Sequence, residues 1–300
     1  MSKVLTMPTS PNFIKSNFRL VRKVGMVSSP YTGSIRTQEY DGVFWEAEVT
    51  LPPMKRATAV EWQAFLLNLN GPVNTFKFAD PDALNPRGTF NNQFQGEARA
   101  NETSATLSFT ASTNTIAGAS STTYFNNVIV GDYIVISGSA KAKNNGTHKV
   151  ITKANAYTIT VEPATADTLV DETNKASCKV QVNVKGATGL SLQAGTTGAS
   201  GTLLKGDYLA ISEDTSAGAS TYTPVQYVMV TEDATVTTHA GKDEYGVKIQ
   251  PKLRKDFASA TQYVYFNPAK GLFRLNQSTV DWDTDNMSRY GFGFSCIEVI

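Results

Sequence analysis

The chain has 300 residues, of which 18% are charged, and its formal net charge at pH 7 is +1. This length allows more than one domain, because a single hydrophobic core usually stops growing near about 250–300 residues. The near-neutral charge excludes a global field that would attract nucleic acid or an anionic membrane, so we expect any partner to be recognised locally.

We expect no targeting segment and no membrane span in this sequence. No stretch approaches the ~18 consecutive apolar residues of a spanning helix, and residues 1–8 lack the apolar core and cleavage site of a signal peptide. We therefore expect the protein to be made and kept in a cytoplasm. Cys178 and Cys296 are too few for a disulfide framework and lack metal-ligand spacing, so we expect two small buried thiols.

Apolar and polar residues alternate through residues 43–51, which predicts a half-buried strand. The apolar positions are Val43, Trp45, Ala47, Val49 and Leu51. After Pro52-Pro53 the period changes to that of a helix, which we place at roughly Met54 to Leu69. Its apolar face is formed by Trp62, Phe65, Leu66 and Leu69. Residues 70–72 end the helix, and residues 74–78 form another short strand.

The middle of the chain differs from its flanks, and two breaks rich in Pro, Asn, Gly or Lys, at residues 80–88 and 251–256, enclose it. No charged residue occurs from Ser104 to Gly131, where small and hydroxyl-bearing residues dominate. This composition disfavours helices and suits short strands joined by turns.

The middle contains an internal repeat. Gly131–Ser137 matches Gly206–Ser212 at an offset of 75 residues, and each begins with Gly-Asp-Tyr, which is typical of a turn that enters a strand. Three further matches support a tandem duplication: Ala105, Leu107 and Phe109 with Val180, Val182 and Val184; His148–Ile151 with Gln226–Met229; and Thr158–Pro163 with Val247–Pro251. The alternative is a chance similarity between two ordinary hairpins. We expect residues 105–165 and 179–256 to share one small β fold.

These patterns predict a mainly β protein with one α-helix. The strands at 43–51 and 76–78 are too few to bury both their own apolar face and that of the helix, so strands at 273–275 and 292–300 must complete the domain. We therefore expect a discontinuous β-barrel or sandwich domain of residues 1–95 plus 260–300. Two similar β units, at 96–175 and 176–259, are expected inside it.

Few side chains in the sequence suggest a catalytic or metal-binding role. Glu46 and Glu48 share one strand face at a spacing that overlaps that of glycosidase carboxylates, but alternating carboxylates on a solvent face explain them better. Residues 281–286 begin like a calcium loop, yet Asn286 replaces the required Gly, and Phe292 stands where a bidentate Glu is needed. An acidic turn accounts for the same residues.

The only histidines, His148 and His239, lack the pattern of a nucleophile and its base. No Gly-rich phosphate loop precedes a helix. We therefore expect no enzyme, no cofactor and no metal, and we assign no catalytic or ligand-binding residue.

Several basic residues lie near aromatic residues in the N-terminal part, which is a weak signal for nucleic acid. The basic residues are Arg19, Arg22, Lys23, Lys55 and Arg56, and the aromatic residues are Phe44, Trp45, Trp62 and Phe65. Cationic edges that resist unwanted strand pairing explain them equally well. We expect a contact between subunits and no sequence-specific binding of nucleic acid.

The segment from Pro11 to Asp82 resembles a family of distal or minor tail proteins from long-tailed bacteriophages. The residues that carry the resemblance are Phe18-Arg19-Leu20, Ser29-Pro30-Tyr31-Thr32-Gly33, residues 45–54 (Trp-Glu-Ala-Glu-Val-Thr-Leu-Pro-Pro-Met), Trp62-Gln63-Ala64-Phe65, Asp80-Pro81-Asp82 and Gly271-Leu272-Phe273-Arg274-Leu275. The family also has a Gly-Asp-Tyr hairpin, of which this chain carries two copies.

The resemblance implies a structural subunit of the phage tail tip, in the virion tail and assembled in the host cytoplasm. The implied partners are further copies in a ring, most often a hexamer, the tail tube protein, hub or fibre proteins, and the tape measure protein. We expect Met1–Ile14 to gain order by lying on a neighbouring subunit, because it cannot fold on itself. The alternative is a module that binds host-surface carbohydrate through the Ser/Thr/Asn-rich middle and exposed tyrosines such as Tyr222 and Tyr227.

Overall fold

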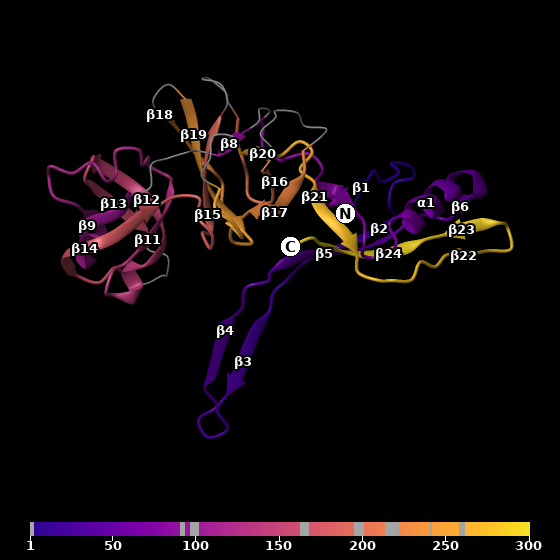
Figure 1. Cartoon of the computed structure of the whole chain (residues 1–300), viewed down its shortest axis with the longest axis horizontal. Coiled ribbons are helices and arrows are strands. Elements are labelled where there is room, and N and C mark those ends of the chain that lie inside the picture. Colours follow the sequence, from indigo (N-terminus) through magenta and orange to yellow (C-terminus); the bar gives the residue numbers. More distant parts are fainter. Residues whose placement is uncertain are drawn as a thin grey trace. The chain divides into compact units, whose positions relative to one another are not determined.

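The computed structural model describes residues 3–90, 94–96, 102–162, 168–194, 201–213, 222–239, 242–257 and 262–300 (Figure 1). Within these ranges the chain is mainly β with one α-helix, which confirms the expected fold class. It divides into two compact units. Unit 1 comprises Met1–Leu84, Pro224–Tyr227 and Ala269–Ile300, and unit 2 comprises Asn85–Thr223 and Val228–Pro268.

Unit 1 is built on a sheet to which both ends of the chain contribute. Its six strands lie in the order β1 (Val4–Leu5), β7 (Thr75–Phe78), β21 (Gly271–Leu275), β24 (Gly293–Glu298), β5 (Phe44–Thr50) and β2 (Lys15–Val21). Only β1 pairs in parallel with its neighbour. The C-terminal strands β21 and β24 separate β7 from β5, so the N-terminal residues alone would leave the sheet divided.

The helix α1 (Arg56–Asn68) buries Trp62, Phe65 and Leu66 of the predicted face, together with Ala59. Leu69, the fourth predicted residue, follows the helix and is also buried. The ring of Phe65 packs edge-on against Phe76 of β7, with centroids 5.5 Å apart. The ring centroids of Trp62 and Phe294 of β24 lie 6.3 Å apart. A small sheet of β22 (Asp283–Thr284), β23 (Arg289–Gly291) and β6 (Met54–Lys55) adjoins the helix.

The N-terminal segment lies on its own unit, contrary to our expectation that a neighbour would order it. The strand β1 pairs with β7, and the indole Nε1 of Trp62 donates to the carbonyl oxygen of Ser10 at 2.9 Å. The ring of Phe13 packs edge-on against Trp62 and Phe78 at 5.9 and 5.8 Å. Burial of aromatic surface therefore fixes this segment within the subunit.

Unit 2 contains a closed six-stranded barrel, which we call the first barrel. Its strands follow the order β9 (Glu102–Thr110), β10 (Thr115–Ala117), β13 (Thr158–Glu162), β12 (Gly146–Asn155), β11 (Tyr133–Ser137) and β14 (Glu172–Gln181), and β14 pairs back onto β9. Alternate residues such as Leu107, Phe109, Ile134 and Ile136 fill its interior. Short 3₁₀ turns occur at Ala111–Thr113 and Ala142–Asn144 in this barrel, and a third, Pro81–Ala83, belongs to unit 1.

A second ring of strands has the same connectivity. It runs through β8 (Phe94–Gly96), β15 (Gly189–Ala194), β19 (Lys242–Gln250), β17 (Pro224–Val230), β16 (Tyr208–Ser212) and β20 (Tyr263–Tyr265), and β20 pairs back onto β8. The pairing of β15 with both β8 and β19 closes this ring. The strand β18 (Thr235–His239) adds to β19 at its edge.

The two Gly-Asp-Tyr turns make the same hydrogen bonds, which supports the duplication. Asp132 Oδ2 accepts from Ile129 N, and Asp207 Oδ2 accepts from Leu204 N, both at 2.8 Å. The glycines before them adopt φ angles of 95° and 94°, where a side chain would be strained. Each turn therefore enters its strand, β11 or β16, in the same way.

The arrangement of the two β units differs from the expected boundary at 175/176. The strand β14 crosses that boundary and closes the first barrel, while β8, the first strand of the second ring, precedes the first barrel in sequence. The first barrel is thus inserted into the second ring. The expected match of Ala105 with Val180 is also corrected, because β9 and β14 are partners in one barrel, where Cys178 lies opposite Ala105.

Candidate functional site

Glu46 and Glu48, the carboxylates that we considered for catalysis, lie on the solvent-facing side of strand β5. Glu46 receives two hydrogen bonds from the guanidinium of Arg19, at 2.9 and 3.1 Å, and a third from Asn276 at 3.3 Å. This contact raises the pKa of Arg19, chiefly through the hydrogen bond to Glu46. Glu48 is exposed on the same face.

The acidic turn is held by one of its own carboxylates. Asp285 Oδ1 accepts from the backbone N–H groups of Met287 and Arg289, at 2.9 and 2.8 Å. Ser288 adopts a φ of 54° to complete the turn. Across the described ranges, no group of three or more His, Cys, Asp or Glu side chains could hold a metal ion.

His148 is buried in the first barrel, where its Nε2 lies 3.0 Å from the carbonyl oxygen of Asn144 and donates to it. Burial lowers its pKa. His239 ends β18, and its side chain lies outside the described residues. Cys178 and Cys296 are buried as expected, and burial raises the pKa of both thiols.

Tyr222 and Tyr227 are buried, which overturns their assignment to an exposed carbohydrate-binding surface. Tyr222 stacks on Tyr265 with ring centroids 3.9 Å apart, and its hydroxyl donates to the carbonyl oxygen of Pro268 at 3.1 Å. Tyr227 lies among the aromatic residues of unit 1. Neither ring can stack on a sugar without local unfolding.

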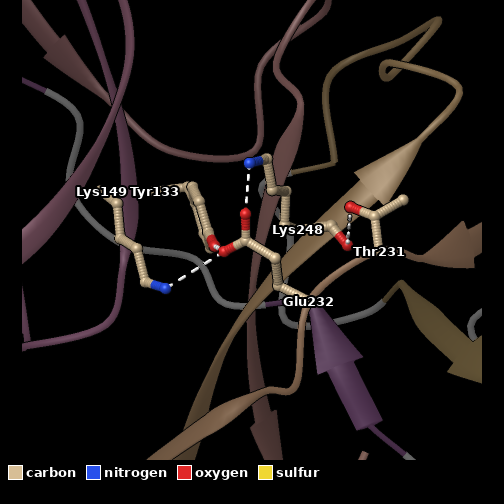
Figure 2. Close-up of polar contacts among 5 residues, drawn as sticks. All are labelled: Tyr133, Lys149, Thr231, Glu232 and Lys248. Carbon is tan, nitrogen blue, oxygen red and sulfur yellow. Dashed lines mark hydrogen bonds and ion pairs between the residues drawn. The ribbon is translucent and has the colours of Figure 1, made fainter. Parts of the chain in front are cut away.

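A group of charged and polar side chains in unit 2 surrounds Glu232 (Figure 2). Its carboxylate accepts from Lys149 at 3.2 Å, from the hydroxyl of Tyr133 at 3.1 Å, and from Lys248. The bond from Lys248 is the main cause that lowers the pKa of Glu232, while burial raises the pKa of Tyr133. Because Tyr133 and Lys149 belong to the first barrel and Lys248 to the second ring, the cluster ties the two together. We assign it a structural role.

A second link between these two elements is buried. Asp132 Oδ1 accepts from the hydroxyl of Ser191 on β15 at 2.9 Å, and both side chains are buried. A Cβ at Gly246 would collide with the carbonyl oxygen of Gly131, so only glycine allows this approach. The Gly-Asp-Tyr turn of the first barrel therefore docks on the second ring.

Unit 1 carries a two-stranded arm, residues 22–40, formed by β3 (Val24–Ser28) and β4 (Ile35–Glu39). The arm continues the hairpin of β2 and β5. Just beyond the last paired residues of those strands, Tyr40 N donates to Lys23 O at 2.9 Å. Figure 1 shows the arm extending beyond the sheet of unit 1, away from α1. In the part of the chain that the structure describes, β3 and β4 pair only with each other.

The arm exposes large apolar side chains. Met26 is 66% exposed, Val27 72%, and Tyr31 at the tip 96%. Val24, Ile35 and Tyr40 are also exposed. A two-stranded hairpin is marginally stable in water by itself, and it usually needs a further strand or a packed surface. The exposed apolar residues of the arm therefore make it a candidate interaction surface.

Local contacts keep the arm ordered. The ring of Tyr40 lies against Gly25, where a Cβ would come within 2.9 Å of the ring. Arg22 pairs with Glu39 at 3.3 Å. At the tip, Ser29 N donates to Ser34 O and Gly33 N to Ser29 O, both at 2.9 Å. These contacts present Tyr31 at the end of a defined turn.

The remaining basic residues are spread over several elements. Arg19 lies on β2, Lys55 on β6, and Arg56 begins α1.

Among the described residues, no helix is long and apolar enough to span a membrane. No protein-family model and no curated protein matches this chain.

Proposed function

We propose that this protein is a non-enzymatic structural subunit of a bacteriophage tail tip, a distal or minor tail protein that forms a closed ring. The observation that carries the proposal is the β3–β4 arm, with its exposed Met26, Val27 and Tyr31. The sequence resemblance to tail proteins supplies the biological setting. The ring, expected to be a hexamer, joins the tail tube to hub or fibre proteins.

The arm suits a head-to-tail contact better than a symmetric one. In a ring each subunit offers one surface to the next copy and a different surface to the previous copy. An arm that leaves its own sheet offers one such surface, and another part of unit 1 offers the other. Because successive contacts repeat one rotation, the assembly closes when that rotation divides a full turn.

Native mass spectrometry of the full chain tests the proposal. We expect a closed oligomer for the wild type and a monomer for Val27→Asp, because a charge at the centre of an apolar contact must be desolvated without a partner. Val73→Asp is the matched control, since Val73 is also an exposed valine of unit 1 but lies outside the arm. A wild-type chain that stays monomeric and is absent from assembled tails would end the proposal.

Carbohydrate binding is the second candidate, and one observation favours it. The outward positions of neighbouring strands in the first barrel carry hydroxyl groups, where Thr115 of β10 lies opposite both Thr110 of β9 and Thr160 of β13. Such a face offers regularly spaced donors and acceptors to a sugar. Binding of the full chain to immobilised host glycans, lost in Thr115→Val with Thr160→Val but kept in Thr37→Val on the arm, would support this role.

A further inference from the structure

A second projection of unit 1 carries the opposite charge to the arm. Residues 281–289, which we call the acidic loop, contain β22 and lead into β23. They hold three aspartates, Asp281, Asp283 and Asp285, against one cation, Arg289. All nine residues are exposed.

The acidic loop also exposes apolar surface. Met287 is 69% exposed, and Trp282 is 41% exposed although its ring reaches Phe292 at 6.5 Å. An indole that is half-packed on its own unit offers a rigid apolar face at little cost in conformational entropy. The loop thus combines acidic and apolar groups, as the rim and centre of a protein interface do.

The arm has the complementary composition. Residues 22–40 hold three cations, Arg22, Lys23 and Arg36, against one carboxylate, Glu39. Arg22 is already paired with Glu39. Lys23 and Arg36 are exposed and belong to the same hairpin as the apolar residues Met26 and Val27.

Both projections belong to unit 1, but they leave it in different directions. Figure 1 shows the arm and the β22–β23 hairpin extending away from one another, with their tips well separated. One copy therefore cannot bring its own arm onto its own acidic loop. Two different surfaces that complement each other on one subunit are what a head-to-tail contact requires.

We infer that the β3–β4 arm of one copy docks on the acidic loop of the next copy of this chain, with Lys23 and Arg36 facing Asp281 and Asp283. Val27 lies opposite Arg36 in the hairpin and so shares its face, where it covers apolar surface of the loop at the centre of the contact. The inference rests on the proposed ring and names the two surfaces that join its subunits. Opposite charges speed the encounter and select this pairing over arm to arm or loop to loop.

Charge reversal of the full chain tests the inference by sedimentation or native mass spectrometry at low salt. An arm variant carries Lys23→Glu with Arg36→Glu, and a loop variant carries Asp281→Lys with Asp283→Lys. Each places like charges together, which we expect to raise the dissociation constant of the subunits about 100-fold. A chain that carries all four substitutions should regain most of the affinity, and this recovery would also show that the substituted chains fold.

The control is Glu61→Lys, a charge reversal at an exposed position of α1 outside both projections, which should leave assembly unchanged. Added salt should weaken the wild-type assembly, because ions screen exposed charges beyond about 10 Å at 0.1 M. If the wild type assembles but the reversals have no effect, or the fourfold variant fails to recover, the arm docks elsewhere and the inference is wrong while the ring stands. If the wild type does not assemble, the proposed ring itself is wrong.

Discussion

The indole Nε1 of Trp45 donates a hydrogen bond of 2.8 Å to the backbone carbonyl oxygen of Tyr227, a residue 182 positions further along the chain. The carboxylate of Glu298 links the same two residues, since it accepts from Tyr227 N at 2.8 Å and from Trp45 N at 3.2 Å. Three segments that are distant in sequence thus meet at one buried acid of unit 1.

Replacing that acid should destabilise unit 1. In Glu298→Ala the N–H groups of Tyr227 and Trp45 lose a charged acceptor in a buried place, and we expect the free energy of unfolding to fall by about 3 kcal/mol. Urea unfolding followed by tryptophan fluorescence measures the change. Glu48→Ala, which removes an exposed acid of the same sheet, should stay within about 0.5 kcal/mol of the wild type.

The sequence predicts the elements of unit 1 well where a single period persists. The alternation at residues 43–51 predicted a strand, which is β5 (Phe44–Thr50) in the structure. The spacing of Trp62, Phe65 and Leu66 predicted a helix, which is α1 (Arg56–Asn68). The C-terminal strands followed from the need to cover that helix. In each case one apolar face must be buried, so local pattern and tertiary packing agree.

The nesting of the β units could not be predicted from the repeat alone. The strand β8 has three residues, Phe94–Gly96, too few to show a period, and it precedes the barrel that separates it from β15. The match of Ala105 with Val180 was wrong for a physical reason. Two strands that pair within one barrel show the same alternation of apolar residues as two equivalent strands of a repeat, so the pattern alone suggests a repeat in both cases. Only the pairing partners distinguish these cases.

The site was harder to predict than the fold. Residues such as Val24 and Met26 alternate like a core strand, and only the structure shows that they lie on an uncovered arm. We expected Tyr227 to be an exposed aromatic, yet it and both its neighbours in sequence are buried. Alternation reveals which residues share a face, but it does not reveal what that face meets.

His148 should make stability depend on pH in a narrow window. Burial lowers its pKa below the ordinary 6.5, so below that pH the unfolded chain binds more protons than the folded chain. The contribution of neutral His148 to stability is present above about pH 6.5 and is lost as the pH falls, by at most about 1.4 kcal/mol per pH unit.

Urea unfolding between pH 7 and pH 5 measures this slope. In His148→Gln, whose amide can still donate to Asn144 O, the part of the slope due to His148 should disappear. The acids Glu172 and Glu232 do not interfere, because their pKa values lie below 4.5 and they titrate below this window. An unchanged slope in the variant would contradict the prediction.

A methyl group at Gly246 should separate the first barrel from the second ring. The added Cβ would meet the carbonyl oxygen of Gly131, which is backbone and cannot move aside. We expect Gly246→Ala to lower stability by about 1–3 kcal/mol and to raise hydrogen exchange at Gly131 and Asp132. Gly293→Ala, where the Cβ meets only Val49 O at 3.5 Å, serves as the control and should show neither effect.

Removal of residues 291–300 should unfold unit 1 while unit 2 stays folded. The deletion takes away β24, which lies inside the sheet between β21 and β5, together with the buried Phe292, Phe294 and Cys296. Loss of one buried Phe alone costs about 3–5 kcal/mol, and a domain has only about 5–15 kcal/mol in total.

Limited proteolysis with mass spectrometry distinguishes the two units in this truncated chain. We expect rapid cleavage within residues 15–78 and protection of the first barrel, because the barrel has its own closed strand pairing and core. Deletion of residues 1–6 is the matched control, since it removes β1, a two-residue strand at the edge of the same sheet. That control should remain folded, because an edge strand leaves the pairing of the other five strands intact. A truncated chain that melts at the same temperature as the full chain would show that the N-terminal strands need no C-terminal partner.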